Sequence, residues 1–127
     1  MNDTRTQARQ SDTFVHASDA PIEDLEPGIK RQILTYGSDL MLCRLWFDSG
    51  VAGTVHQHPH SQISYIESGR FRAMMGGKER ELVAGDSVAI TPDTDHGITC
   101  IEAGSLLDIF NPVREDFLEG GSYNAEG

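Results

Sequence analysis

The chain has 127 residues, which is enough for one compact domain and too few for two of ordinary size. Its 38% hydrophobic and 24% charged residues are typical of a globular protein, and no apolar run approaches the roughly 20 residues that a membrane helix needs. Twenty acidic side chains against ten basic ones give a formal charge of -10, which disfavours nucleic acid and anionic membranes as partners.

The two ends of the chain differ from its middle. Residues 1–29 are polar and show no helical or strand periodicity, so we expect a loosely ordered N-terminal arm. They carry no apolar core of a secretory signal, which predicts a cytoplasmic protein. Residues 30–118 are expected to form the domain, and the small, polar residues 119–127 a flexible tail.

Within the domain, short apolar or alternating runs are separated by residues that favour turns. This pattern predicts about nine strands and an all-β sandwich or small barrel, with a short helical turn near residues 114–118. Cys43 and Cys100 each lie in an apolar run without metal-ligand spacing, so we expect buried free thiols. The expected strands cover residues 31–36, 40–48, 54–58, 62–68, 70–75, 79–83, 86–90, 97–103 and 105–110.

The histidines form the most informative motif. His56 and His58 stand two residues apart, so in an extended strand both imidazoles point to one side; Gln62 has the same parity, and His96 follows a separate strand. Three imidazole nitrogens and one amide oxygen suit a divalent transition metal, whereas a lone HxH would favour an exposed strand face or a turn. Pro59 interrupts strand geometry before His60, which is therefore expected to support the site rather than bind the metal.

The spacing of these residues resembles that of the cupin family. Gln62 stands where the cupin motif usually has Glu, and Thr91 and Asp93 replace a Pro and a Gly of a turn. The resemblance implies a jelly-roll β-barrel, or double-stranded β-helix, that holds one metal ion and commonly forms a homodimer through its sheets. The residues that match the motif are Gly50, His56, His58, Gln62, Gly69, Gly85 and His96.

Gln62 affects the chemistry that a bound metal would support. With no anionic protein ligand, the full charge of the ion stays available to polarise a substrate oxygen, which favours Lewis-acid chemistry over oxygenase chemistry. Nickel, zinc, iron and manganese all remain candidates for the ion.

Two longer motifs are similar to the KdgF-type cupins of pectin and alginate degradation. They are HQHPHSQISY and DIFNPVREDF, and the similarity extends from about residue 29 to residue 118. The resemblance implies ring opening of 4,5-unsaturated monouronates to 5-keto-4-deoxyuronate. It implies metal ligands at His56, His58, Gln62 and His96, and catalytic residues at Asp108, Phe110 and Arg114.

The residues themselves support these roles. Alternation puts Asp108 and Phe110 on one strand face, where partial desolvation would raise the pKa of the carboxyl and suit it to proton transfer. The alternative is that this face turns to solvent. The planar fork of Arg114 could hold a substrate carboxylate, although a surface ion pair with Glu115 or Asp116 is the simpler interpretation.

Other functions stay open at this point. A metal-dependent dioxygenase or sugar isomerase could use the same barrel, and a non-catalytic acid-binding cupin or a structural role is a different class of answer. Arg70 and Arg72 share one strand face, for which a solvated outer surface is the simpler interpretation, and Tyr65 is expected in the core or at an interface.

Overall fold

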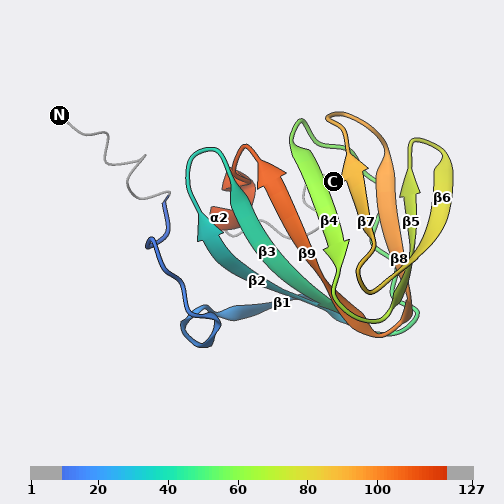
Figure 1. Ribbon diagram of the computed structural model, residues 1–127, viewed down its shortest axis with the longest axis horizontal. Helices are drawn as coiled ribbons and strands as arrows, with labels where there is room; N and C mark the ends of the chain where they lie inside the picture. The colour runs from blue at the N-terminus through green and yellow to red at the C-terminus, as the bar shows by residue number, and fades with distance from the viewer. Residues whose placement is uncertain (1–9, 120–127) are drawn as a thin grey trace.

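The computed structural model describes residues 10–119, which form nine strands and two short helices (Figure 1). The all-β prediction is therefore confirmed, as is the helical turn near residue 114. Neither described helix is long or apolar enough to cross a membrane. The elements are η1 (Ala17–Asp19), β1 (Ile22–Glu26), β2 (Ile29–Tyr36), β3 (Met41–Phe47), β4 (Ser61–Ile66), β5 (Arg70–Met75), β6 (Lys78–Val83), β7 (Ser87–Ile90), β8 (His96–Glu102), β9 (Gly104–Asn111) and α2 (Glu115–Leu118).

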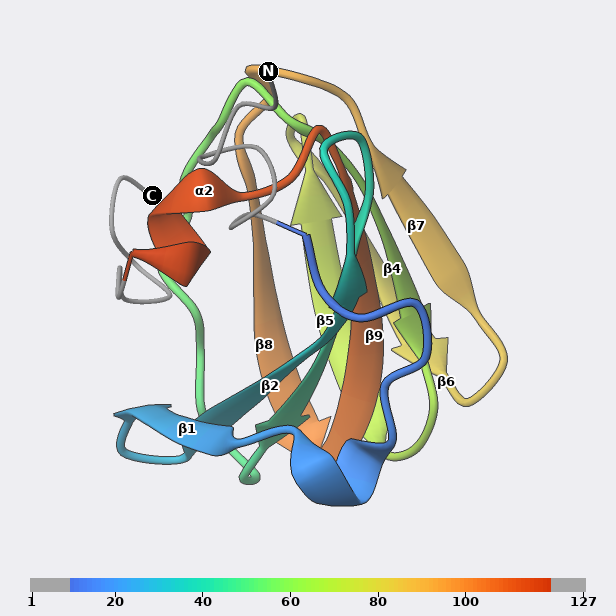
Figure 2. The same ribbon diagram turned by 90° about the vertical axis from the view of Figure 1, so that its left-hand side faces the viewer.

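The strands form two antiparallel sheets. The larger sheet has the order β1-β2-β3-β9-β4-β7 and the smaller one the order β6-β5-β8. In Figures 1 and 2 both sheets curve around a common interior, as expected for a jelly roll. The last long strand, β9, pairs with both β3 and β4, so residues of β9 occupy the middle of the larger sheet.

Alternation along the strands builds the core. In β3 every second residue, from Met41 to Phe47, is buried, and Phe47 meets Phe71 of the smaller sheet edge to face with ring centroids 5.5 Å apart. Cys43 and Cys100 are both buried and free, as expected. Burying each large apolar side chain stabilises the fold by roughly 1.5–3 kcal/mol.

Two expectations about secondary structure are wrong. Ile22–Glu26 of the expected arm forms β1, which pairs with β2, and η1 is tied to the domain by Gln32, whose Nε2 donates to two carbonyl oxygens of that turn. The expected strand over 54–58 is not regular: it meets β8 at one isolated bridge, His56 with His96, and a second bridge, Ala52 with Thr99, lies just before it. Residues 1–9 and 120–127 lie outside the described residues, and the division into arm, domain and tail stays a prediction.

The motif glycine Gly69 lies where two turns pack together. It has a φ of +85°, and a Cβ added there would lie 2.5 Å from the carbonyl oxygen of Glu102 and 2.8 Å from the Cα of Gly104. Only glycine meets both demands without strain. The turn between β4 and β5 is thereby fixed against the turn between β8 and β9.

Candidate metal centre and active site

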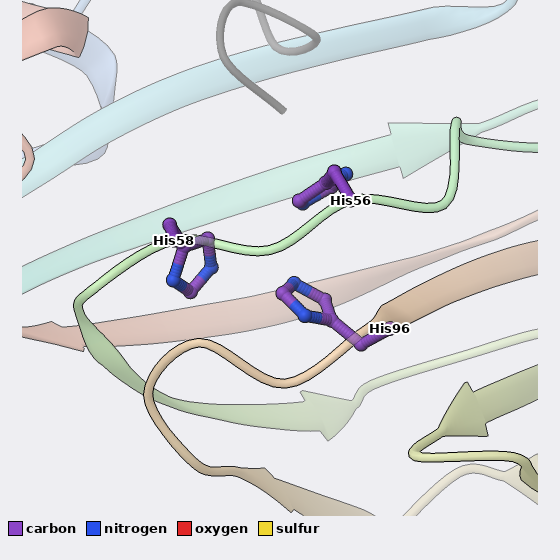
Figure 3. Close-up of side chains that lie close together, drawn as sticks. All are labelled: His56, His58 and His96. Carbon is purple, nitrogen blue, oxygen red and sulfur yellow. The ribbon is translucent and has the colours of Figure 1, made fainter.

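Three histidines from two segments of the chain point toward one another (Figure 3). His56 and His58 lie on the segment before β4, and His96 is the first residue of β8. The backbones of His56 and His96 exchange two hydrogen bonds of 2.9 Å, which brings the two segments together. One nitrogen from each ring lies within 4.8 Å of the others. The predicted convergence of these residues is confirmed, although through isolated bridges rather than a strand.

Each imidazole is held in one orientation by the backbone. The Nδ1 atom of His56 lies 2.6 Å from the carbonyl oxygen of Thr54, and that of His96 lies 2.9 Å from the carbonyl oxygen of Thr94. A carbonyl oxygen only accepts hydrogen bonds, so both Nδ1 atoms carry the proton and the lone pair is on Nε2. The Nε2 of His96 is buried without a hydrogen-bond partner among the described residues.

A neutral His58 cannot satisfy both of its neighbours. Its Nδ1 lies 3.1 Å from the carbonyl oxygen of His60 and its Nε2 lies 2.9 Å from Oε1 of Gln62, yet a neutral imidazole has one N–H. The Gln62 amide is held, because its Nε2 donates to Ser64 Oγ and to Asp108 Oδ1. A cation bound by both the His58 nitrogen and the Gln62 oxygen would remove the conflict, because it takes a lone pair from each of them. The site therefore fits a metal ion held by nitrogen and oxygen.

The electrostatics of the cluster also suit metal binding. Burial lowers the pKa of His56 and of His58, and it lowers the pKa of His96 to about 4. The positive charge of Arg114 also lowers the pKa of all three rings. Neutral imidazole is the form that binds a metal, so the cluster is ready for one at neutral pH.

Asp108 projects from β9 into the interior beside Gln62. Its Oδ1 accepts hydrogen bonds from Ser64 Oγ at 2.5 Å and from Gln62 Nε2 at 3.1 Å. Burial raises the pKa of this carboxyl to about 6, although both hydrogen bonds oppose the rise. Its Oδ2 makes no hydrogen bond to the described residues. The predicted face is buried, and the solvent-facing alternative is wrong.

A small cavity adjoins these polar groups. Its volume is about 20 Å³. This is room for one water molecule, which needs roughly 10–15 Å³. The lining residues are Gln62, Ser64, Ala73, Met74, Val88, Ile90, His96, Gly97, Ile98, Leu106 and Asp108.

Phe110 and Arg114 also lie beside the cluster. The Phe110 ring is 6.0 Å from that of His58, and the Arg114 guanidinium carbon is 5.1 Å from the Phe110 centroid. Arg114 does pair with Asp116, as the simpler interpretation expected, but the pair is not on the surface, because the Arg114 side chain is only 4% exposed. The structure thus brings Asp108, Phe110 and Arg114 to the histidine cluster.

The remaining candidates lie around the site or away from it. His60 is half-buried beside Phe110, with ring centroids 6.5 Å apart, and burial lowers its pKa. Arg70 and Arg72 pair with Glu81 on the outer face of the smaller sheet, which confirms the solvated-surface interpretation. Tyr65 is 42% exposed, so it lies outside the core.

Sequence reasoning missed several residues that support the site. Ser64 shares the parity of Gln62, and that signal could have identified it. Arg31, on β2, is buried and places its guanidinium carbon 3.9 Å from the Phe117 centroid. No periodic pattern links Arg31 to the rest of the site, because the contact is made by side chains of distant segments.

Comparison with known proteins identifies the family. Residues 47–110 match the cupin domain family. The chain is 41% identical over 102 residues to the pectin degradation protein KdgF of Dickeya dadantii, a match that covers 79% of this chain and 93% of that protein.

Solved structures agree with this match. The fold superposes on an RmlC-like cupin from Shewanella frigidimarina with a TM-score of 0.83 and 44% identity, covering 86% of this chain and 98% of that one. It superposes on KdgF from Halomonas sp. with a TM-score of 0.80 and 38% identity, covering 84% of this chain and 99% of that one. The chain therefore belongs to the cupin family and, within it, to the KdgF group.

Proposed function

We propose that this chain is a metal-dependent, non-redox enzyme that opens the ring of 4,5-unsaturated monouronates to give 5-keto-4-deoxyuronate. The observation that carries the proposal is the placement of Asp108, whose carboxylate is bound to the same Gln62 amide that faces the histidine cluster. The relationship to a pectin degradation protein supports a uronate as the substrate. The similarity extends over 102 residues of this chain and covers 93% of that relative.

His56, His58, His96 and Gln62 are the residues that would hold the metal ion. A divalent ion in this neutral ligand set would supply Lewis-acid chemistry, by polarising substrate oxygens and stabilising negative charge that develops on them. Nickel, zinc, iron and manganese fit such ligands. The protein residues around the ion then decide which bond of the substrate breaks.

Asp108 is the proposed general base and acid. The substrate is a cyclic hemiacetal whose ring oxygen is part of an enol ether. Asp108 Oδ2 takes the proton of the anomeric hydroxyl, the bond from C1 to the ring oxygen breaks, and an aldehyde and an enolate form. The protonated Asp108 returns the proton to C4, which leaves a ketone at C5. Atoms and charge balance without an oxidant, and a pKa raised by burial suits a group that both takes and returns a proton.

Arg114 and Phe110 are proposed to position the substrate. The guanidinium can hold the substrate carboxylate by two parallel hydrogen bonds, and it lies close enough to the cluster for its charge to lower the pKa of His58 and His96. Phe110 contacts both His58 and Arg114 and so forms an apolar wall between them. This wall would limit the access of water to the reacting atoms.

One experiment tests the proposal. The metal-loaded protein is mixed with freshly made unsaturated galacturonate, and loss of the C4 vinyl proton is followed by NMR. The parent should accelerate this loss, and Asp108→Asn should lower kcat by about 100-fold or more because the proton acceptor is removed. Asp39→Asn, an exposed position, is the matched control. A parent rate equal to the spontaneous rate would contradict the proposal.

The same assay separates the other candidate functions. Consumption of oxygen during turnover would indicate a dioxygenase. Binding of the uronate without any acceleration would indicate an acid-binding cupin without catalytic activity. If Asp108→Asn turns over the substrate as fast as the parent, the proposed reaction stands but Asp108 is not its general base.

A further inference from the structure

The motif that ends the domain contains two residues that the proposed mechanism does not use. Asp116 and Phe117 belong to α2, the single helical turn that follows Arg114. Both contact Arg114 directly, and Phe117 is itself buried. Their contacts determine how the guanidinium of Arg114 lies.

Asp116 occupies one edge of that guanidinium. Its Oδ1 accepts from Nε at 3.0 Å and its Oδ2 accepts from Nη2 at 2.8 Å, which is a bidentate pair. A guanidinium has a second edge, formed by Nη1 and the other N–H of Nη2, that can take a carboxylate in the same way. Nη1 makes no hydrogen bond to the described residues, whose contacts with this guanidinium use Nε and Nη2. The second edge is therefore left for a ligand.

Phe117 fixes the plane of the same group. Its ring centroid lies 4.2 Å from the guanidinium carbon of Arg114 and 3.9 Å from that of Arg31. The ring also meets Phe110 edge to face, with centroids 5.5 Å apart. Such contacts between a desolvated cation and an aromatic face are favourable and directional. A rotation of the Arg114 plane would break the contacts with Phe117 and the bidentate pair together.

We propose that Asp116 and Phe117 are positioning residues, which orient the free edge of Arg114 for the carboxylate of the substrate and so select anionic over neutral sugars. The inference rests on the proposed function, because it takes the ligand of Arg114 to be the uronate carboxylate. It also gives α2 a role: this helical turn holds the guanidinium of Arg114 in place, and Asp116 and Phe117 do so without touching the substrate.

Charge and orientation make opposite predictions for Asp116, which allows a sharp test. Removing a negative charge beside Arg114 would by itself strengthen the attraction of Arg114 for an anion. Loss of orientation would weaken binding, because two parallel hydrogen bonds need a fixed plane. Weaker binding after Asp116→Asn therefore reports positioning.

The experiment uses the metal-loaded full chain and two readouts. The first is kcat and KM with unsaturated galacturonate. The second is the Kd for D-galacturonate compared with that for its methyl ester, measured by calorimetry, which needs no turnover. For Asp116→Asn we expect KM and the Kd for the acid to rise about tenfold, because a hydrogen bond to a charged group contributes about that much to binding. The Kd for the ester should not change, and kcat should change less than about threefold.

Two further variants complete the design. Glu115→Gln removes the same charge from the exposed neighbouring position of α2 and should leave both readouts unchanged. Asp116→Glu keeps a partner for the buried cation, so it should fold even if Asp116→Asn does not, but its longer side chain should still raise KM severalfold. Thermal unfolding of each variant is recorded, because a purely structural role would lower Tm and leave the preference for the acid intact.

The outcomes keep the two proposals apart. A parent that binds the acid selectively but does not turn over the unsaturated uronate contradicts the proposed function and retains the inference. A parent that turns over, with Asp116→Asn and Asp116→Glu matching Glu115→Gln in KM and in selectivity, overturns the inference. So does a parent that binds the acid and the ester equally well.

Discussion

Gln62 shows why an amide serves this site where a carboxylate would not. Its oxygen faces Nε2 of His58, and its nitrogen donates to Ser64 and to Asp108. A glutamate at this position has no N–H to donate and would place a second negative charge about 3 Å from the buried Asp108 carboxylate. The Gln that departs from the usual cupin motif is thus the residue that connects the histidine cluster to the proposed base.

Ser64 is expected to tune the affinity for metal through this amide. It accepts from Gln62 and donates to Asp108, so Ser64→Ala removes a contact that holds the amide oxygen toward His58. Partners that orient metal ligands are commonly worth 10-fold to 100-fold in affinity, and we expect a loss of about 10-fold here. Titration of the metal-free protein with zinc or nickel measures it. Ser61→Ala, an exposed position on the same strand, is the control, and equal affinities in the two variants would contradict this role.

At the scale of the elements, an ion pair holds three strands of the larger sheet together. Glu67, which follows β4, accepts from Arg44 of β3 at 2.9 and 3.0 Å, and its Oε1 also accepts from Ser105 of β9 at 2.9 Å. Since β9 lies between β3 and β4, the cluster spans the sheet. The hydrogen bonds from Arg44 hold the pKa of Glu67 below its ordinary value.

This lowered pKa predicts a pH-dependent contribution to stability. A carboxylate with a lower pKa in the folded state stabilises the fold above its unfolded-state pKa of about 4.3, and the contribution is lost as the pH falls through the folded-state value. We therefore expect Glu67→Gln to lower the free energy of unfolding by about 1 kcal/mol at neutral pH. Urea unfolding of parent and variant at pH 7 and at pH 3.5 measures the difference, which should shrink at the lower pH. A difference independent of pH would contradict the prediction.

Most elements could be predicted from the sequence, and the exceptions have physical causes. Burial alternates strictly along β3 and from Leu106 onward along β9, because one face of each strand is buried, so their period is visible. The short edge strand β1 pairs only with β2 and is rich in acids, and neither property resembles a buried strand. The segment 54–58 has alternating residues, but Gly53 precedes it and Pro59 follows it. Its backbone therefore meets β8 only at the bridge between His56 and His96.

The candidate site was predictable only in part. Parity was enough to place His56 and His58 on one side of the chain, whereas their meeting with His96 and with the buried face of β9 followed from the resemblance to cupins. The contacts of Phe117 with Arg31 and Arg114 depend on how α2 packs against strands that are distant in sequence, and no local pattern encodes that packing. The role of Asp116 is local, but the sequence could not distinguish a buried pair from a surface one.

For the whole molecule, the acidic ends have a function that net charge alone does not reveal. The buried guanidinium of Arg31 pairs with Glu23 of β1 at 3.0 Å, and that of Arg114 pairs with Asp116 of α2 at 2.8 Å. Both partners come from the terminal parts of the domain. An unpartnered buried cation is costly, so these pairs let the barrel keep two arginines inside it. Two of the twenty acidic residues are therefore counter-charges for arginines inside the barrel, and the net charge of -10 comes from the acids that have no basic residue to offset them.

The outer face of the larger sheet predicts how the molecule associates. Ile63 and Ile109 face each other on β4 and β9, and they are 48% and 37% exposed; Tyr65, on the same face of β4, is 42% exposed. An exposed apolar face of this kind marks a protein interface, and a symmetric dimer can pair the face with a copy of itself. We expect the chain to form the homodimer that its resemblance to cupins implies.

Light scattering coupled to size-exclusion chromatography tests this expectation. The parent should elute with twice the 13.9 kDa mass of one chain. Ile63→Lys should shift it to the monomer mass, because a charge would have to be desolvated at the centre of the apolar face. Val83→Lys changes an apolar side chain that is 37% exposed on the smaller sheet and should leave the dimer intact. A monomeric parent at high concentration, or dissociation by Val83→Lys alone, would show that this face is not the interface.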